Sequence, residues 1–175
     1  YMPSLGYYSG KSEKFGESGD FITAAEETDI LGRIIAKQCS IILNQIPNAS
    51  IIEYGPGSGA LAVSILKQLF KMDLKPSTYF MVEISEDLIK RQKDRISSEM
   101  PEIYDSVSWA SEIPEGFNGV VIANEVIDSM PFERFMISGN DILQFFIGIK
   151  EEELIYKLRS ADIDIKRYVK KIEKS

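Results

Sequence analysis

Glu53-Tyr54-Gly55-Pro56-Gly57-Ser58-Gly59 carries a glycine at every second position from 55 to 59. The mostly apolar run at 51–54 is typical of a short strand, and the apolar spacing over 61–70 indicates a helix. Glycine at a strand-to-helix turn permits positive φ and lets a ligand lie against bare backbone, while the first N–H groups of the helix attract an anionic group. The segment therefore predicts a nucleotide-binding turn.

Further strands and helices alternate along the chain around this turn. Apolar periodicity predicts helices at 30–45 and 86–98, and strands at 79–83, 107–109 and 119–124. Four apolar residues in succession within the last of these segments indicate a strand buried on both faces. Because strands that alternate with helices form parallel sheets, we predict an α/β fold with a Rossmann-like, doubly wound, mostly parallel sheet.

The pattern changes after Pro131. Apolar segments at 134–137 and 142–149 flank a Ser-Gly-Asn-Asp turn, which predicts a β-hairpin inserted after the fourth strand. The charged tail at 162–175 is expected to form a helix.

We expect residues 1–175 to form one domain with an N-terminal segment at 1–29, a core at 30–131, and the hairpin and its helix at 132–175. Four strands before the hairpin are fewer than a doubly wound domain normally has. The first residues, Tyr1-Met2-Pro3, also do not resemble a natural beginning. We therefore expect a domain truncated at both ends.

Composition excludes several classes of function. The net charge of −7 and pI of 4.8 argue against a nucleic-acid partner held through its phosphates, and fit a basic protein or peptide better. The chain has no histidine and one cysteine, Cys39, so we expect no Ser-His-Asp triad, no disulfide framework and no metal site. No apolar run approaches the roughly 18 residues of a membrane span.

Two acidic residues flank the glycine turn and suggest its ligand. Glu53 suits an ammonium group, such as the amine of S-adenosyl-L-methionine, better than a pyrophosphate. Glu83 ends the second strand, where a carboxylate can accept hydrogen bonds from the ribose hydroxyls of either S-adenosyl-L-methionine or NAD. NAD stays open at this point, because Gly55-x-Gly57-x-x-Ala60 also satisfies the looser dinucleotide fingerprint.

A polar segment follows the fourth strand. It reads Asn124-Glu125-Val126-Ile127-Asp128-Ser129-Met130-Pro131, at the edge where open α/β sheets bind ligands. We predict that these polar groups form a site for the reacting partner, with Glu125, Asp128 and Asn124 as candidate catalytic residues, and that Asn124 shapes the reactive end of the cofactor. The two acids could instead be first-turn helix residues favoured by the macrodipole.

Four segments in order resemble the MidA-like family of class I S-adenosyl-L-methionine-dependent methyltransferases. They are Gly6-Tyr7-Tyr8, residues 16–24 (GESGDFITA), residues 53–61 and residues 123–131. The likeness runs from Gly6 to Phe135. Ala25 departs from the proline usual in this family, the match after Phe135 is loose, and the family's C-terminal portion is absent.

The resemblance implies a class I methyltransferase fold, S-adenosyl-L-methionine as cofactor and a protein arginine as substrate. If the substrate is arginine, Glu125 and Asp128 are the carboxylates expected to hold its guanidinium. The family includes a mitochondrial assembly factor that methylates an arginine of respiratory complex I, so a respiratory-complex subunit is a candidate partner. Such a protein would be cytoplasmic in a bacterium and in the mitochondrial matrix in a eukaryote. The implied cofactor site comprises the following residues: Glu53, Gly55, Gly57, Gly59, Glu83 and Asn124, with Gly19, Asp20 and Thr23 in a segment that covers the cofactor.

Two other functions remain open on the sequence. A non-catalytic assembly factor that binds S-adenosyl-L-methionine would carry the same residues. An NAD-dependent oxidoreductase would need a hydride-transfer partner, which the sequence does not show, and the lack of histidine weakens it further.

Overall fold

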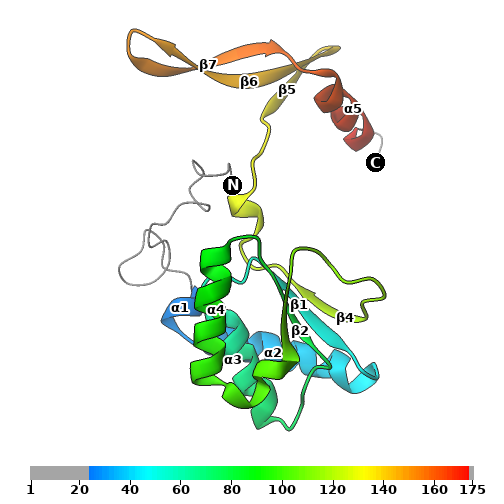
Figure 1. Ribbon diagram of the computed structural model, residues 1–175. Helices are drawn as coiled ribbons and strands as arrows, with labels where there is room; N and C mark the ends of the chain where they lie inside the picture. The colour runs from blue at the N-terminus through cyan, green and yellow to red at the C-terminus, as the bar shows by residue number, and fades with distance from the viewer. Residues whose placement is uncertain (1–23, 174–175) are drawn as a thin grey trace. The chain divides into compact units, whose positions relative to one another are not determined.

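The computed structural model describes residues 24–173, which divide into two compact units between Val126 and Ile127 (Figure 1). The division falls shortly before Pro131, where we expect the core to end. The interpretation of residues 1–175 as one domain stays a prediction.

The first unit is built on a parallel sheet. Its strands are β1 (Ser50–Tyr54), β2 (Tyr79–Val82), β3 (Val107–Ala110) and β4 (Gly119–Ile122), in the order β3-β2-β1-β4. Every pair is parallel, which confirms the α/β prediction. The chain moves from β1 to β2 on one side and returns to β4 on the other, so the order reverses at β1, where open α/β sheets place their ligands.

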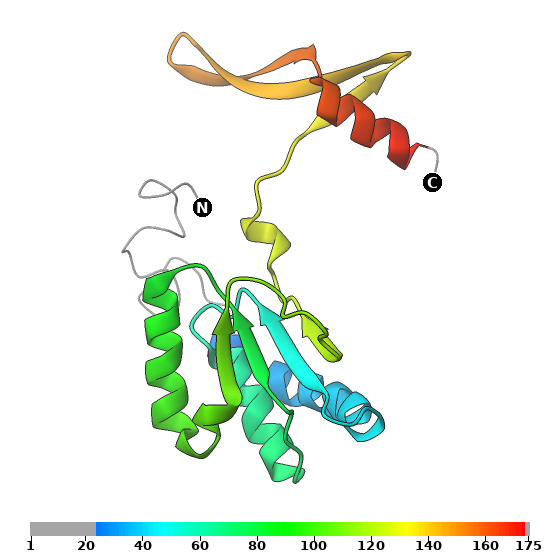
Figure 2. The ribbon, with the colours of Figure 1, turned by 45° about the vertical axis from the view of Figure 1, so that its right-hand side comes forward.

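Three helices cover the same face of this sheet (Figure 2). They are α2 (Ile30–Gln45), α3 (Ala60–Lys71) and α4 (Glu86–Glu99), with the short α1 (Ala24–Glu27) before them and the 3-10 helix η1 (Pro101–Ser106) leading into β3. The second helical layer that a doubly wound sheet carries on its other face is not formed by residues 24–126.

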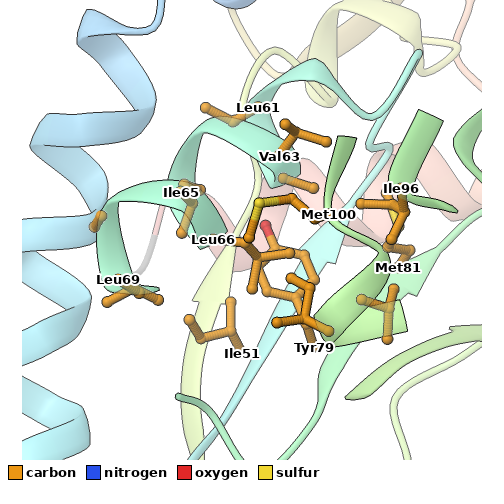
Figure 3. Packing of buried hydrophobic residues seen from close by; sticks show 14 of the residues in the cluster. Ile51, Leu61, Val63, Ile65, Leu66, Leu69, Tyr79, Met81, Ile96 and Met100 are labelled. Atoms are coloured by element: carbon orange, nitrogen blue, oxygen red, sulfur yellow. The ribbon is translucent and has the colours of Figure 1, made fainter. Parts of the chain in front are cut away.

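The core lies between α3 and the covered face of the sheet (Figure 3). Leu66 and Leu69 of α3 pack in one cluster with Ile51 and Tyr79 of the sheet. Helix α2 approaches α3 closely at Gly32, where a Cβ atom would lie 2.4 Å from the side chain of Ser64. Only glycine fits there, so α2 and α3 pack closely against each other at this point.

The second unit is an antiparallel sheet with one helix. It contains the 3-10 turn η2 (Ile127–Ser129), strands β5 (Phe135–Ser138), β6 (Asp141–Lys150) and β7 (Glu153–Ser160), and helix α5 (Ile163–Ile172). The predicted hairpin is therefore confirmed as β5 and β6, and the predicted C-terminal helix as α5.

Strand β7 was not predicted from the sequence. It pairs with β6 over its full length, from Glu153 opposite Lys150 to Ser160 opposite Leu143. The turn between them uses Glu151 and Glu152 at φ of 51° and 69°. Because left-handed turn positions usually carry glycine or asparagine, two glutamates give no turn signal.

Among residues 24–173 no helix is long and apolar enough to cross a membrane.

The packing of α3 predicts unequal effects for two neighbouring residues. Leu69 is 0% exposed and Phe70 is 58% exposed. Leu69→Ala should lower the free energy of unfolding by about 2–5 kcal/mol, because it removes buried methyl groups and leaves a cavity. Phe70→Ala should cost about 1 kcal/mol or less. Urea denaturation measures both, and equal losses would contradict this orientation of α3.

Candidate functional site

The turn between β1 and α3 requires its glycines. Gly55, Gly57 and Gly59 have φ of 57°, 56° and 84°, all in the left-handed region that side chains with a Cβ atom disfavour. Gly59 is also the N-cap of α3, and its N–H donates to the Pro56 carbonyl at 2.8 Å. The turn thus leaves β1 and starts α3 within a few residues, with its backbone uncovered by side chains at three positions.

Glu83 lies beside this turn, directly after β2. The Gly55 N–H donates to the Val82 carbonyl at 3.1 Å, which ties the start of the turn to the end of β2. One carboxylate oxygen of Glu83 accepts from the backbone N–H groups of Ile84 at 2.8 Å and Ser85 at 2.9 Å. These bonds hold the half-buried carboxylate at the edge of the sheet where the glycine turn lies.

Glu53 lies beneath the turn, on the helix-covered face of β1. It is 2% exposed, and the Tyr79 hydroxyl donates to its carboxylate at 2.6 Å. Burial raises the pKa of Glu53 to about 7, although the hydrogen bond from Tyr79 acts in the opposite direction. Burial and the neighbouring Glu53 carboxylate also raise the pKa of Tyr79 well above its ordinary value. The contact of Glu53 with an ammonium group stays a prediction.

The polar segment after β4 borders the first glycine. A Cβ atom on Gly55 would lie 3.4 Å from the Val126 side chain. Just before Val126, Asn124 is half-buried, and Glu125 is exposed with a φ of 54°, which is unusual for a residue other than glycine. Residues 124–126 therefore meet the glycine turn at the switch point of the sheet.

The predicted site residues fall into three groups by their place in the structure. Those at the C-terminal ends of β1, β2 and β4 are brought together: Glu53, Gly55, Gly57, Gly59, Glu83, Asn124 and Glu125. Asp128 is exposed and lies in η2, in the second unit. Gly19, Asp20 and Thr23 lie outside the described residues.

Side chains of α4 and α1 that the sequence did not indicate as site residues form hydrogen bonds with the glycine turn. Gln92 of α4 donates to the Gly57 carbonyl at 2.8 Å. Arg95, three residues further along α4, donates to the Ser58 hydroxyl at 2.8 Å, and Glu26 of α1 bonds both of these groups. One signal was present, because Gln92 is a polar residue within the apolar stripe of its helix.

Over residues 24–173 no group of three or more histidine, cysteine or acidic side chains is arranged to hold a metal ion.

Residues 30–175 match the model of a protein family described as "Putative S-adenosyl-L-methionine-dependent methyltransferase". The chain belongs to this family. The match includes every element from α2 to α5 and so spans both units. It confirms the methyltransferase resemblance that the sequence predicts.

Named relatives agree with this assignment. The chain is 30% identical over 184 residues to the mitochondrial protein arginine methyltransferase NDUFAF7 homolog of Drosophila melanogaster, covering 91% of this chain and 39% of the relative. It is 28% identical over 176 residues to the corresponding protein of Caenorhabditis elegans, covering 86% of this chain and 40% of the relative. The chain thus spans about two fifths of the length of these relatives.

A solved structure shows the same fold. The crystal structure of a Burkholderia thailandensis protein bound to S-adenosyl-homocysteine superposes with a TM-score of 0.82 at 28% identity, covering 97% of this chain and 46% of that one. A second structure from the same organism gives a TM-score of 0.76 at 27% identity, covering 97% and 43%.

The buried Glu53 carboxyl predicts a pH dependence of stability. Because its pKa in the folded protein is raised from 4.5 to about 7, the folded state binds this proton more tightly than the unfolded state. The resulting stability is fully present below the ordinary pKa and is lost as pH rises through about 7, by on the order of 3 kcal/mol.

Glu53→Gln should remove this part of the pH dependence, since its amide stays neutral and still accepts from Tyr79. Urea denaturation at pH 5 and pH 8 measures the difference, with Glu102→Gln, at an exposed position of η1, as the control. A wild-type loss that persists in Glu53→Gln would show that another group causes it.

Proposed function

We propose that this chain binds S-adenosyl-L-methionine at the glycine turn and serves methyl transfer to an arginine of a protein. The observation that carries the proposal is the turn itself, with three left-handed glycines between β1 and α3 and the Glu83 carboxylate held beside it. Family membership and the likeness to a structure bound to S-adenosyl-homocysteine support the choice of ligand.

Each predicted residue has a role in the proposed cofactor site. The carboxylate of Glu83 accepts from the ribose hydroxyls, and Glu53 compensates the charge of the cofactor's ammonium group. Gly55, Gly57 and Gly59 let the cofactor lie against the backbone. Asn124 lies at the reactive end, and Gly19, Asp20 and Thr23 belong to the segment that covers the cofactor.

The residues after β4 serve the substrate in this proposal. When bound, S-adenosyl-L-methionine supplies a methyl group already activated on a sulfonium, so the chain mainly has to align the incoming nitrogen, and orientation can contribute about 7 kcal/mol or more. Glu125 and Asp128 hold the guanidinium, which is charged at all physiological pH values and matches paired carboxylates. The positive φ of Glu125 supports this role, because strained residues concentrate at functional sites.

The proposed partner is an arginine-bearing protein, with a respiratory-complex subunit as the finer candidate. The names of the curated relatives place those proteins in mitochondria. We therefore propose the mitochondrial matrix for a eukaryotic source and the cytoplasm for a bacterial one. The net charge of −7 suits a basic partner segment.

Calorimetric titration tests the cofactor. S-adenosyl-L-methionine and S-adenosyl-homocysteine should bind the wild-type chain and NAD should not. Glu83→Ala should weaken binding about tenfold to a hundredfold, because it removes hydrogen bonds to a charged acceptor. Glu102→Ala, at an exposed position of η1 before β3, should bind as the wild type does. Binding of NAD but of neither S-adenosyl compound would contradict this proposal and favour an NAD-dependent oxidoreductase.

A methyl-transfer assay tests the carboxylates after β4. In the full-length protein, Glu125→Ala and Asp128→Ala should keep their affinity for S-adenosyl-homocysteine. Each should transfer labelled methyl groups to arginine-containing protein at least about a hundredfold more slowly, since an unpaired guanidinium loses its charged hydrogen bonds.

Glu115→Ala, on the exposed loop before β4, is the matched control for this assay. Full activity in both site variants would remove these two residues from the mechanism. Cofactor binding without any methyl transfer by the wild type would favour the non-catalytic assembly factor.

A further inference from the structure

Gln92 is a fully buried polar side chain in contact with the glycine turn. It is 0% exposed in the middle of α4, within an apolar stripe that includes Leu88 and Ile96. Its amide nitrogen donates to the Gly57 carbonyl at 2.8 Å, and its amide oxygen accepts from the Trp109 indole N–H at 2.9 Å. A buried amide is costly unless it is bonded, so both ends of this side chain have a defined partner.

Trp109 determines which way the Gln92 amide points. An indole nitrogen can only donate, so the amide oxygen must face it and the NH₂ group must face Gly57. The Trp109 ring is itself held, because Tyr104 lies 5.9 Å away between ring centroids and the Lys93 ammonium lies 5.2 Å from the ring centroid. Strand β3 and helix α4 therefore fix one donor against the turn.

The hydrogen bond from Gln92 to the Gly57 carbonyl fixes the orientation of a peptide group within the glycine turn. Gly57 is the middle glycine of the turn, and its peptide bond to Ser58 is planar and trans. When the C=O of Gly57 points toward α4, the N–H of Ser58 points the opposite way. The Gln92 amide thus determines which side of the turn presents an N–H group and which presents a carbonyl.

A second side chain of α4 bonds the residue on the other side of this peptide bond. Gln92 and Arg95 lie three positions apart on α4 and so share one face of the helix. Arg95 holds the Ser58 hydroxyl at 2.8 Å, while Glu26 bonds both groups from α1. The two residues that share this peptide bond are therefore both hydrogen-bonded to α4, Gly57 through its carbonyl and Ser58 through its hydroxyl.

We propose that Gln92 is a positioning residue for the cofactor, which holds the Gly57–Ser58 peptide in its binding orientation, with Trp109 fixing the Gln92 amide. The inference rests on the proposed function, because it concerns the same turn. It adds two residues that touch no part of the ligand and act through the backbone.

The discriminating variant is Gln92→Glu, which keeps the shape of the side chain and replaces its NH₂ donor with an oxygen that donates only when it is protonated. Because burial favours the protonated carboxyl, the test is made at pH 9, where the ionised carboxylate accepts but cannot donate to the Gly57 carbonyl. Affinity for S-adenosyl-homocysteine should then fall about tenfold or more. At pH 5 the carboxyl gains protons and can donate again. The ratio of variant to wild-type affinity should therefore recover as pH falls, which a loss of packing alone would not produce.

Three further chains complete the titration. Gln92→Leu has no donor at any pH and should stay weak throughout. Trp109→Phe should lose about threefold, because the amide is no longer oriented. Gln38→Leu, at an exposed position of α2, makes the same chemical change away from the turn and should match the wild type.

Thermal melting of each variant, before titration, separates loss of folding from loss of affinity.

The two proposals fail in different ways. A wild-type chain that binds no S-adenosyl-homocysteine or S-adenosyl-L-methionine would overturn the proposed function and this inference with it. A wild type that binds, together with a folded Gln92→Leu of equal affinity, would overturn only the role of Gln92.

Discussion

The direction of the chain between β1 and α3 depends on backbone conformations that only glycine adopts easily. Three left-handed residues at alternating positions turn the chain from the centre of the sheet into α3, which contributes more residues to the core than any other element. A side chain at Gly59 would meet Gln92 at 3.4 Å and Met81 at 3.5 Å, in addition to the cost of its φ of 84°. The same positions leave bare backbone facing the edge where β1, β2 and β4 end. One conformational requirement thus serves both the packing of α3 and the approach of a ligand.

The second constraint is the burial of polar groups directly beneath that turn. Glu53 faces Tyr79, and Gln92 faces both Trp109 and the Gly57 carbonyl. Across the described residues no buried side-chain nitrogen or oxygen lacks a hydrogen-bond partner. Such networks contribute little net stability compared with an apolar core of the same shape, since desolvation offsets most of the gain. Their position next to the turn supports the proposed role of Gln92 in orienting the Gly57–Ser58 peptide.

The parts of the structure that could be predicted are those that depend on residues close together in the sequence. The helices and parallel strands of the first unit follow from apolar periodicity, and the turn follows from its glycines. Strand β7 was missed because Glu151 and Glu152 adopt left-handed conformations without a residue type that signals them. The pairing of Glu53 with Tyr79 was also beyond reach. It depends on the register of β1 against β2, which sets Ile51 opposite Tyr79, and register is a property of the assembled sheet.

The site therefore consists of two kinds of residue that differ in how they can be recognised. Glycines at fixed spacing and acids at strand ends are visible in the sequence, because their geometry depends on their immediate neighbours along the chain. Gln92 and Arg95 of α4 bond the turn directly, and Trp109 of β3 bonds Gln92. These residues lie between 34 and 51 positions from Ser58 in the chain, as the numbers of Ser58, Gln92 and Trp109 show. For such residues the sequence shows only a polar side chain at a position where the helix pattern calls for an apolar one, as at Gln92 of α4. A buried amide needs a hydrogen-bond partner, so this pattern indicates that a partner exists. Only the packing of α4 against the glycine turn shows that the partner is the Gly57 carbonyl.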